Sequence, residues 1–207
     1  MSGLSSGFRW LSGLLGLLLV LAAVAAAAAW WWIDQPLPLA ADHAELSIEA
    51  GALPREVAQA WVDAGVQAVQ LFDSWVGTLA PEDYREFVLP HSYAVLQSIK
   101  GRVPVIHFGV GTSTLLPFMA AAGGDVMGLD WHTPIAMTRE KLGFKAVQGN
   151  LDPCTLFAPR DELKRKAMQV LDDAGDNPGH IFNLGHGITP DASPDNVKLM
   201  IDTVRGG

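Results

Sequence analysis

From Ala68 onward, two patterns of hydrophobic and polar residues alternate along the chain. Short apolar runs are typical of buried parallel strands, and longer stretches with apolar residues at helical spacing separate them. This alternation predicts an α/β fold with about five βα units and a parallel sheet. The predicted strands are Ala68–Phe72, Val103–Phe108, Val126–Leu129, Ala146–Gln148 and Ile181–Leu184. The predicted helices are Glu82–Lys100, Thr114–Ala122, Ile135–Leu142, Asp161–Leu171 and a last one that Ser193 caps before Pro194.

The N-terminal part has a different pattern, because Trp10–Ile33 holds no charged residue. A helix of about 24 residues is roughly 36 Å long, which is enough to cross a bilayer core. Trp30–Trp32 suit an interfacial aromatic belt, and Arg9 before the run, with acids after it, places the N-terminus in the cytoplasm. We therefore predict a transmembrane anchor over residues 1–33 and a membrane-anchored chain. The alternative is a signal peptide cleaved near Ala25–Ala29, which the length of the run and the three tryptophans disfavour.

A linker, residues 34–65, joins the predicted anchor to the βα array. Proline punctuates Asp34–Ala41, a short strand is expected at Glu45–Ile48, and Gly51–Asp63 has helical spacing. Pro36-Leu37-Pro38-Leu39, Ser47-Ile48-Glu49-Ala50-Gly51 and Val57-Ala58 resemble the membrane-anchor region of bacterial endolytic murein transglycosylases. That resemblance covers about the first 65 residues and none of that family's catalytic domain, so it implies no lytic activity. The expected domains are an anchor at 1–33, a linker at 34–65 and a partial barrel at 66–207.

Composition narrows the classes of function. The 207 residues are 49% hydrophobic, which suits one good-sized domain and an extra segment. The formal net charge is -8 without a basic patch, which argues against nucleic acid as a partner. The single cysteine, Cys154, has no partner for an internal disulfide and belongs to no Cys-x-x-Cys zinc motif.

Polar residues follow each predicted strand. The carboxyl ends of parallel strands converge on one mouth in barrel and doubly wound folds, so these residues are candidates for a shared site. His186 is the most prominent, since a glycine on either side lets the backbone approach a ligand. Each candidate also has a purely structural interpretation, as a loop histidine, a helix cap or a buried core histidine. The candidates are Asp73-Ser74-Trp75, His107-Phe108-Gly109, Asp130-Trp131, Gln148-Gly149-Asn150 with Asp152-Pro153, and Gly185-His186-Gly187, and we expect Ser74, Asp130, Asn150 and His186 on one rim.

Four motifs in this region resemble uroporphyrinogen decarboxylase, in that family's order and spacing. They are Leu71–Trp75, Gly128–Trp131, Gln148–Pro153 and Asn183–Ile188, within a match from about Ala64 to Arg205. The resemblance implies a partial (β/α)8 TIM barrel and a cytoplasmic, homodimeric carboxy-lyase without metal or organic cofactor. Such an enzyme decarboxylates the acetate side chains of uroporphyrinogen III to give coproporphyrinogen III in haem biosynthesis. By position, Ser74 and His186 are implied to contact the substrate's carboxylates or pyrroles, and Phe72 is implied to form an apolar wall against the macrocycle.

The resemblance is incomplete. The family's Arg-Gln-Ala-Gly-Arg-Tyr motif is absent from the sequence, and its essential Asp and working Tyr are unmatched. No catalytic residue is therefore carried over, and about five of eight barrel strands are expected. An anchor joined to part of a barrel favours a truncated or chimeric chain that is inactive alone. The alternatives are a membrane-tethered module that binds a porphyrin or a partner chain, and a corrinoid-type zinc methyltransferase, against which Gly109 and the single cysteine argue.

Overall fold

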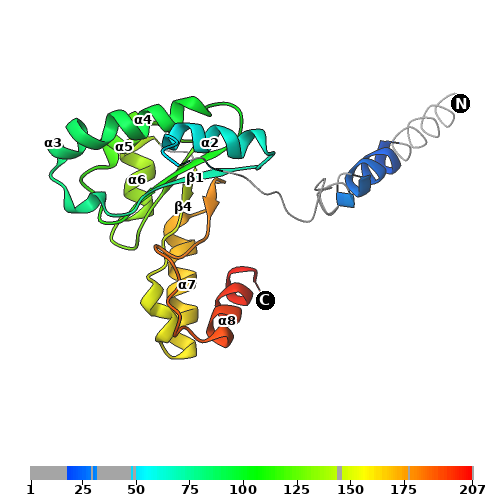
Figure 1. Cartoon of the computed structure of the whole chain (residues 1–207). Coiled ribbons are helices and arrows are strands. Elements are labelled where there is room, and N and C mark those ends of the chain that lie inside the picture. The colour runs from blue at the N-terminus through cyan, green and yellow to red at the C-terminus, as the bar shows by residue number, and fades with distance from the viewer. Residues whose placement is uncertain are drawn as a thin grey trace, which may run out of the picture. The chain divides into compact units, whose positions relative to one another are not determined.

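The computed structural model describes residues 18–28, 30–31, 48, 50–143, 146–176 and 178–206 (Figure 1). The chain divides into two compact units, Met1–Glu45 and Leu46–Gly207. In the first unit, residues 18–28 and 30–31 are helical. The linker predicted at Asp34–Ala41 and most of the strand predicted at Glu45–Ile48 lie outside the described residues, and Ile48 itself belongs to no strand.

The predicted transmembrane anchor and membrane-anchored localisation are contradicted. Within the described ranges, the structure contains no helix that has both the length and the apolar character needed to cross a membrane. The rest of the Trp10–Ile33 segment lies outside the described residues.

The second unit is built on one parallel sheet, as the sequence predicts. Its strands are β1 (Val69–Asp73), β2 (Val105–Gly109), β3 (Val126–Gly128), β4 (Val147–Gln148) and β5 (His180–Ile181). They lie in chain order, and each pairs in parallel with the next. A doubly wound sheet reverses its order at a switch point, whereas a TIM barrel adds each new strand on the same side. The observed order is that of part of a barrel wall.

Helices connect the strands and cover one face of the sheet. The α-helices are α2 (Pro54–Asp63), α3 (Pro81–Asp83), α4 (Leu89–Ser98), α5 (Leu116–Ala122), α6 (Ile135–Leu142), α7 (Arg160–Ala174) and α8 (Pro194–Val204), and the short 3-10 helices are η1 (Val76–Thr78) and η3 (Pro153–Phe157). Pro54 and Pro194 stand in the first turns of α2 and α8, where the missing N–H breaks no helical bond. Figure 1 shows α2, α4 and α5 together on one side of the sheet, and α7 packs against α8.

The helix predicted at Glu82–Lys100 forms as a helical segment interrupted by a π-helical turn, η2 (Tyr84–Val88). The Leu89 N–H bonds to Tyr84 O, one residue further back than in an α-helix. Pro90 has no N–H to offer the carbonyl four residues before it, so the α-helical ladder is broken at this point. Tyr84 is fully buried in this turn.

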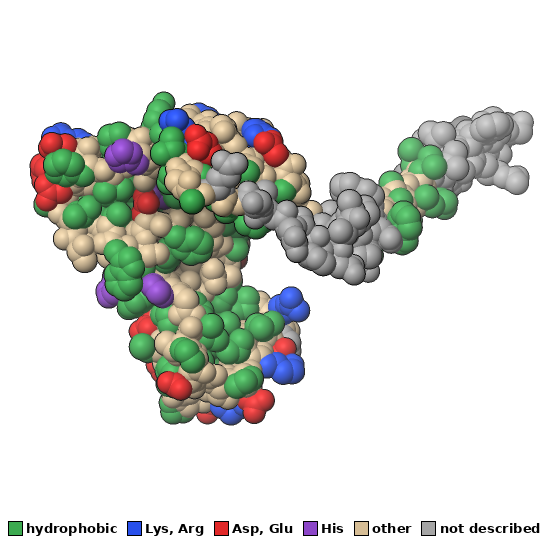
Figure 2. Space-filling model, in the orientation of Figure 1, with side chains coloured by type: hydrophobic (Ala, Val, Ile, Leu, Met, Phe, Trp, Pro, Cys, Tyr) green, Lys and Arg blue, Asp and Glu red, His purple; other side chains and the backbone are tan. Residues whose placement is uncertain are grey.

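Two hydrophobic clusters hold the second unit together. The larger one runs from Met119 of α5 and Met127 of β3 to Leu163 of α7. The smaller one joins α2 and α4 to the sheet through Ala58 and Leu96. On the face of the second unit seen in Figure 2, charged side chains gather toward the outer ends, and hydrophobic and uncharged side chains cover much of the middle.

Candidate functional site

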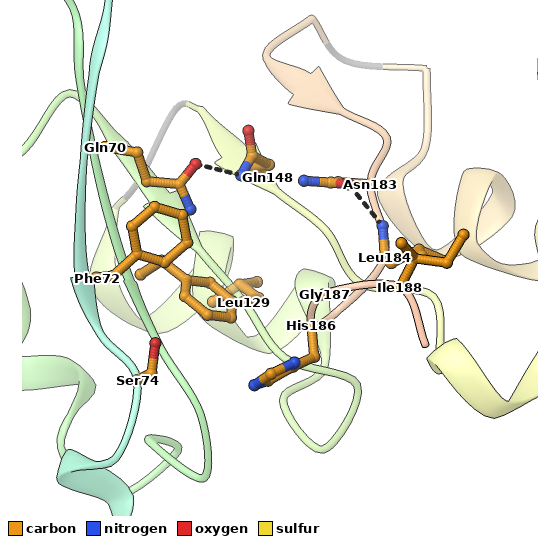
Figure 3. Close-up of a pocket in the computed structure, with 11 residues that line it drawn as sticks. Gln70, Phe72, Ser74, Leu129, Gln148, Asn183, Leu184, His186, Gly187 and Ile188 are labelled. Carbon is orange, nitrogen blue, oxygen red and sulfur yellow. Dashed lines mark hydrogen bonds between the residues drawn. The ribbon is translucent and has the colours of Figure 1, made fainter. Parts of the chain in front are cut away.

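The other side of the sheet carries a cavity of about 480 Å³ (Figure 3). Phe72, Ser74 and His186, the three residues predicted to contact a substrate, all line it. The fold thus brings the end of the first strand next to the segment that follows the last. The cavity is lined by Gln70, Phe72, Ser74, Phe108, Leu129, Gln148, Asn183, Leu184, His186, Gly187 and Ile188.

Strand β1 directs alternate side chains into this cavity, because successive residues of a strand face opposite sides of a sheet. Gln70 and Phe72 lie on the cavity side, and Ser74 follows just beyond the strand. Phe72 is 64% exposed and meets the Phe108 ring edge-on, with centroids 5.8 Å apart. Gly128 makes room for this pair, since a Cβ there would lie 2.9 Å from Cδ2 of Phe108. The result is an aromatic wall that is open to a ligand.

The segment after β5 carries His186 into the cavity. Leu184 pairs with Leu151 in an isolated bridge, and the Gly185 N–H donates to Leu151 O at 2.7 Å. Gly185 lies so close to the loop after β3 that a Cβ on it would be 2.6 Å from the backbone nitrogen of Trp131. A glycine is therefore needed at this position. The His186 imidazole follows directly and has no hydrogen bond within the described part of the chain. It is therefore available to a ligand.

Three carboxamides, Gln70, Gln148 and Asn183, form a row across the cavity, which we call the amide row (Figure 3). Gln148 Nε2 donates to Gln70 Oε1 at 3.2 Å, and the Leu184 N–H donates to Asn183 Oδ1 at 2.9 Å. Gln70 is not among the predicted site residues, although it stands two residues before Phe72 and therefore on the same face of β1. Among the described residues that line the cavity, none is Asp, Glu, Lys or Arg.

The helix side of β1 carries a buried polar cluster around Asp73. Its Oδ2 accepts hydrogen bonds from Ser92 Oγ at 2.8 Å, His107 Nε2 at 2.8 Å and Tyr84 Oη at 3.3 Å. Burial is the largest single influence and raises the pKa of Asp73, whereas the hydrogen bond and the electrostatic attraction of His107 lower it. Bonds from Ser92 and Tyr84 lower it further, so the pKa of Asp73 lies below its ordinary value. The pKa of Tyr84 is raised, first by burial and then by the charge of Asp73.

His107 is fully buried in this Asp73 cluster, which agrees with the structural interpretation of a core histidine. Because Asp73 is ionised and can only accept, the imidazole Nε2–H must be the donor to it. The other ring nitrogen, Nδ1, is buried without a hydrogen-bond partner in the described part of the chain. The cluster faces the helices, so it fixes β1 against α4 and does not contact the cavity.

Asp130 and Asn150 follow β3 and β4 at the same end of the sheet as Ser74 and His186, as predicted, but their side chains do not line the cavity. Asp130 is fully buried, and its carboxylate accepts the Gly111 N–H at 2.7 Å and the Thr133 hydroxyl at 2.8 Å. Asn150 Nδ2 donates to the carbonyls of Asp130 at 3.1 Å and Thr133 at 2.6 Å. These side chains are already engaged in holding the loops after β2, β3 and β4 together.

Comparisons with known proteins agree with the barrel-like fold and with the family that the sequence motifs resemble. A family model described as uroporphyrinogen decarboxylase (URO-D) matches residues 49–207. Proteins named uroporphyrinogen decarboxylase are 47% identical over 164 residues in Geotalea uraniireducens, 53% over 153 in Sorangium cellulosum and 49% over 148 in Thermus thermophilus. These alignments cover 79, 73 and 71% of this chain but 48, 44 and 43% of the relatives. The chain spans about half the length of the curated relatives it matches.

A solved structure, a methyltransferase from Methanosarcina mazei, matches with a TM-score of 0.64 and 21% identity, covering 74% of this chain and 46% of that one. At this identity the match shows a shared fold and nothing about the reaction. These matches do not carry the resemblance of the N-terminal residues to murein transglycosylases, which stays a prediction. The domain limits at residues 33 and 65 and the homodimer also stay predictions.

Proposed function

Because the chain belongs to the uroporphyrinogen decarboxylase family, we propose that its cavity binds uroporphyrinogen. The observation that carries this proposal is the gathering of Phe72, Ser74 and His186 around one cavity. A cavity of about 480 Å³ with an aromatic wall and a few neutral polar groups suits a ring of pyrroles with polar arms.

Each of the three residues has a role in this proposal. The exposed Phe72 ring, supported edge-on by Phe108, offers an apolar surface to one pyrrole of the macrocycle. The Ser74 hydroxyl and the His186 imidazole donate hydrogen bonds to carboxylate arms, and neither spends a donor on another described residue. These groups bind and orient the ligand.

We expect the 207-residue chain on its own not to decarboxylate uroporphyrinogen. Loss of carbon dioxide here needs a protonated pyrrole as the electron sink, and a nearby carboxylate is the natural group to stabilise that cation. Asp73 faces the helices and Asp130 is saturated by loop donors, so neither serves. Within the described residues, β1 and β5 each pair with one strand, so this wall does not enclose a ligand as a full barrel does. Removing one preorganised electrostatic group commonly lowers a rate about 10²–10³-fold.

The proposal is tested by incubating the purified chain with uroporphyrinogen and by titrating it separately with uroporphyrin. We expect saturable binding of uroporphyrin and no coproporphyrinogen. The substitution His186→Ala should weaken binding by about 1–3 kcal/mol, the cost typical of a lost polar contact. His91→Ala, which changes an exposed histidine of α4 on the helix side, is the matched control and should leave the affinity unchanged.

Two outcomes would overturn this proposal in different ways. If uroporphyrin does not bind, or if both histidine variants bind as the unsubstituted chain does, the cavity is not the binding site. Formation of coproporphyrinogen that His186→Ala or Ser74→Ala abolishes would show that the chain is catalytically complete, contrary to our expectation.

A further inference from the structure

We propose that the amide row, Gln70, Gln148 and Asn183, is a subsite that recognises one acetate side chain of the macrocycle through neutral N–H donors. This inference rests on the proposed function, since it concerns the same cavity and ligand. It assigns ligand recognition to residues other than Phe72, Ser74 and His186. It also explains how a cavity wall without cations would bind a carboxylate.

Gln148 is the best-defined member of the row. Its side chain is 7% exposed and lines the cavity, so a ligand reaches it only from the cavity side. Its single hydrogen bond among the described residues runs to Gln70, at 3.2 Å. An amide group carries two N–H hydrogens and a carbonyl oxygen, so this one bond leaves both glutamines with free hydrogen-bonding capacity. The bond also holds the two carboxamides in fixed positions relative to each other.

Asn183 adds a donor whose direction is set by the backbone. Its Oδ1 is engaged by the Leu184 N–H at 2.9 Å, which leaves the Nδ2 end for the cavity. Figure 3 shows this nitrogen directed toward Gln148, on the opposite side from Gln70. Free N–H donors are therefore available on both sides of Gln148.

A carboxylate is the ligand group that this arrangement fits. Hydrogen bonds from N–H groups to an anion are stronger than those between neutral partners, and no acidic side chain among the described lining residues repels it. Buried donors left unpaired cost free energy, so a ligand that lacks the matching acceptor is disfavoured. The position of the amide row favours a short side chain of the macrocycle, such as an acetate. Gln70 lies only two residues, or about 7 Å, from Phe72, against which the macrocycle would pack.

The experiment compares two porphyrins that differ in this arm. Uroporphyrin carries acetates where coproporphyrin carries methyl groups, and both keep their propionates. Fluorescence titrations should show that the unsubstituted chain binds uroporphyrin about tenfold more tightly. Gln70→Glu and Gln148→Glu place a negative charge against the acetate and should remove this preference, while the affinity for coproporphyrin changes less than about twofold.

The matched control is Gln169→Glu, which adds the same charge at an exposed position of α7. It should keep the full preference for uroporphyrin. Gln70→Met, which is uncharged and of similar length, should also lose the preference, and retained coproporphyrin binding shows that each variant is folded. If the chain binds neither porphyrin, the proposed function and this inference fail together. If it binds both and the glutamine variants keep the preference, this inference alone is overturned.

Discussion

The two faces of β1 differ in how their polar groups are used. On the helix side, the Asp73 carboxylate accepts bonds from three side chains, one of them Ser92 of α4, and is mostly buried. On the cavity side, Phe72 is 64% exposed, and the carboxamide of Gln70 has one partner among the described residues. A single strand of five residues thus carries a carboxylate oxygen with three side-chain partners on one face and unused donors on the other.

This difference distinguishes residues that stabilise the fold from residues that are available to bind a ligand. A buried group whose partners are all internal contributes to the free energy of unfolding, and its loss leaves those partners unpaired. A group with unused donors beside an exposed ring contributes little to stability and is available for binding. Substitutions on the helix side should therefore change stability, and substitutions on the cavity side should change affinity.

Asp73→Ala should have the greatest effect on stability. The change removes the acceptor shared by three donors and leaves the buried His107 without its partner, so we expect a loss of about 3 kcal/mol in the free energy of unfolding. Urea denaturation measures this. Asp172→Ala, at an exposed position of α7, is the control and should change stability by less than about 0.5 kcal/mol. Equal effects of the two substitutions would contradict a role for the Asp73 cluster in stability.

Phe72→Ala should lower the affinity for uroporphyrin and change the stability little. The side chain is mostly exposed, so the free energy of unfolding should fall by less than about 1 kcal/mol. The affinity for uroporphyrin should fall about tenfold, because the aromatic wall is lost. Phe157→Ala is the control, since that ring is similarly exposed on η3 and lies outside the cavity. A large loss of stability without a loss of affinity would place Phe72 in the core.

A weaker effect should appear in the acid dependence of stability. The folded-state pKa of Asp73 lies below the 3.8 of an ordinary aspartate, so its ionised form stabilises the fold. This contribution is fully present well above pH 3.8 and is lost as the pH falls through the lower folded-state value. The difference in unfolding free energy between the unsubstituted chain and Asp73→Asn should therefore shrink in acid. A difference that stays constant with pH would exclude this role for the carboxylate.

Much of the sheet could be predicted from the sequence because its signals are local. Apolar runs locate β1 to β4, and the Gly185-His186-Gly187 motif locates a loop that does reach the cavity. The last strand is predicted at Ile181–Leu184 from its apolar run. In the structure, β5 ends at Ile181, so the predicted strand is too long. Beyond that point Leu184 makes only an isolated bridge.

Other features depend on contacts that no local pattern reveals. Gln70 and Gln148 are 78 residues apart and meet only because the sheet curves from β1 to β4. Asp130 follows a strand as a site residue would, yet its carboxylate is engaged by three loop residues, Gly111, His132 and Thr133. The uncharged run Trp10–Ile33 predicts a membrane span, and the described residues contain no helix that satisfies that prediction.

The measurement that tests the cavity as the ligand site most directly is the NMR spectrum of the chain with uroporphyrin. A porphyrin ring current shifts the resonances of protons that lie over its face. Binding in the cavity should shift the ring resonances of Phe72 upfield, should also shift those of His186 and should leave those of Phe157 and His91 unchanged. Shifts at Phe157 or His91 with none at Phe72 and His186 would contradict the assignment of the cavity as the tetrapyrrole site.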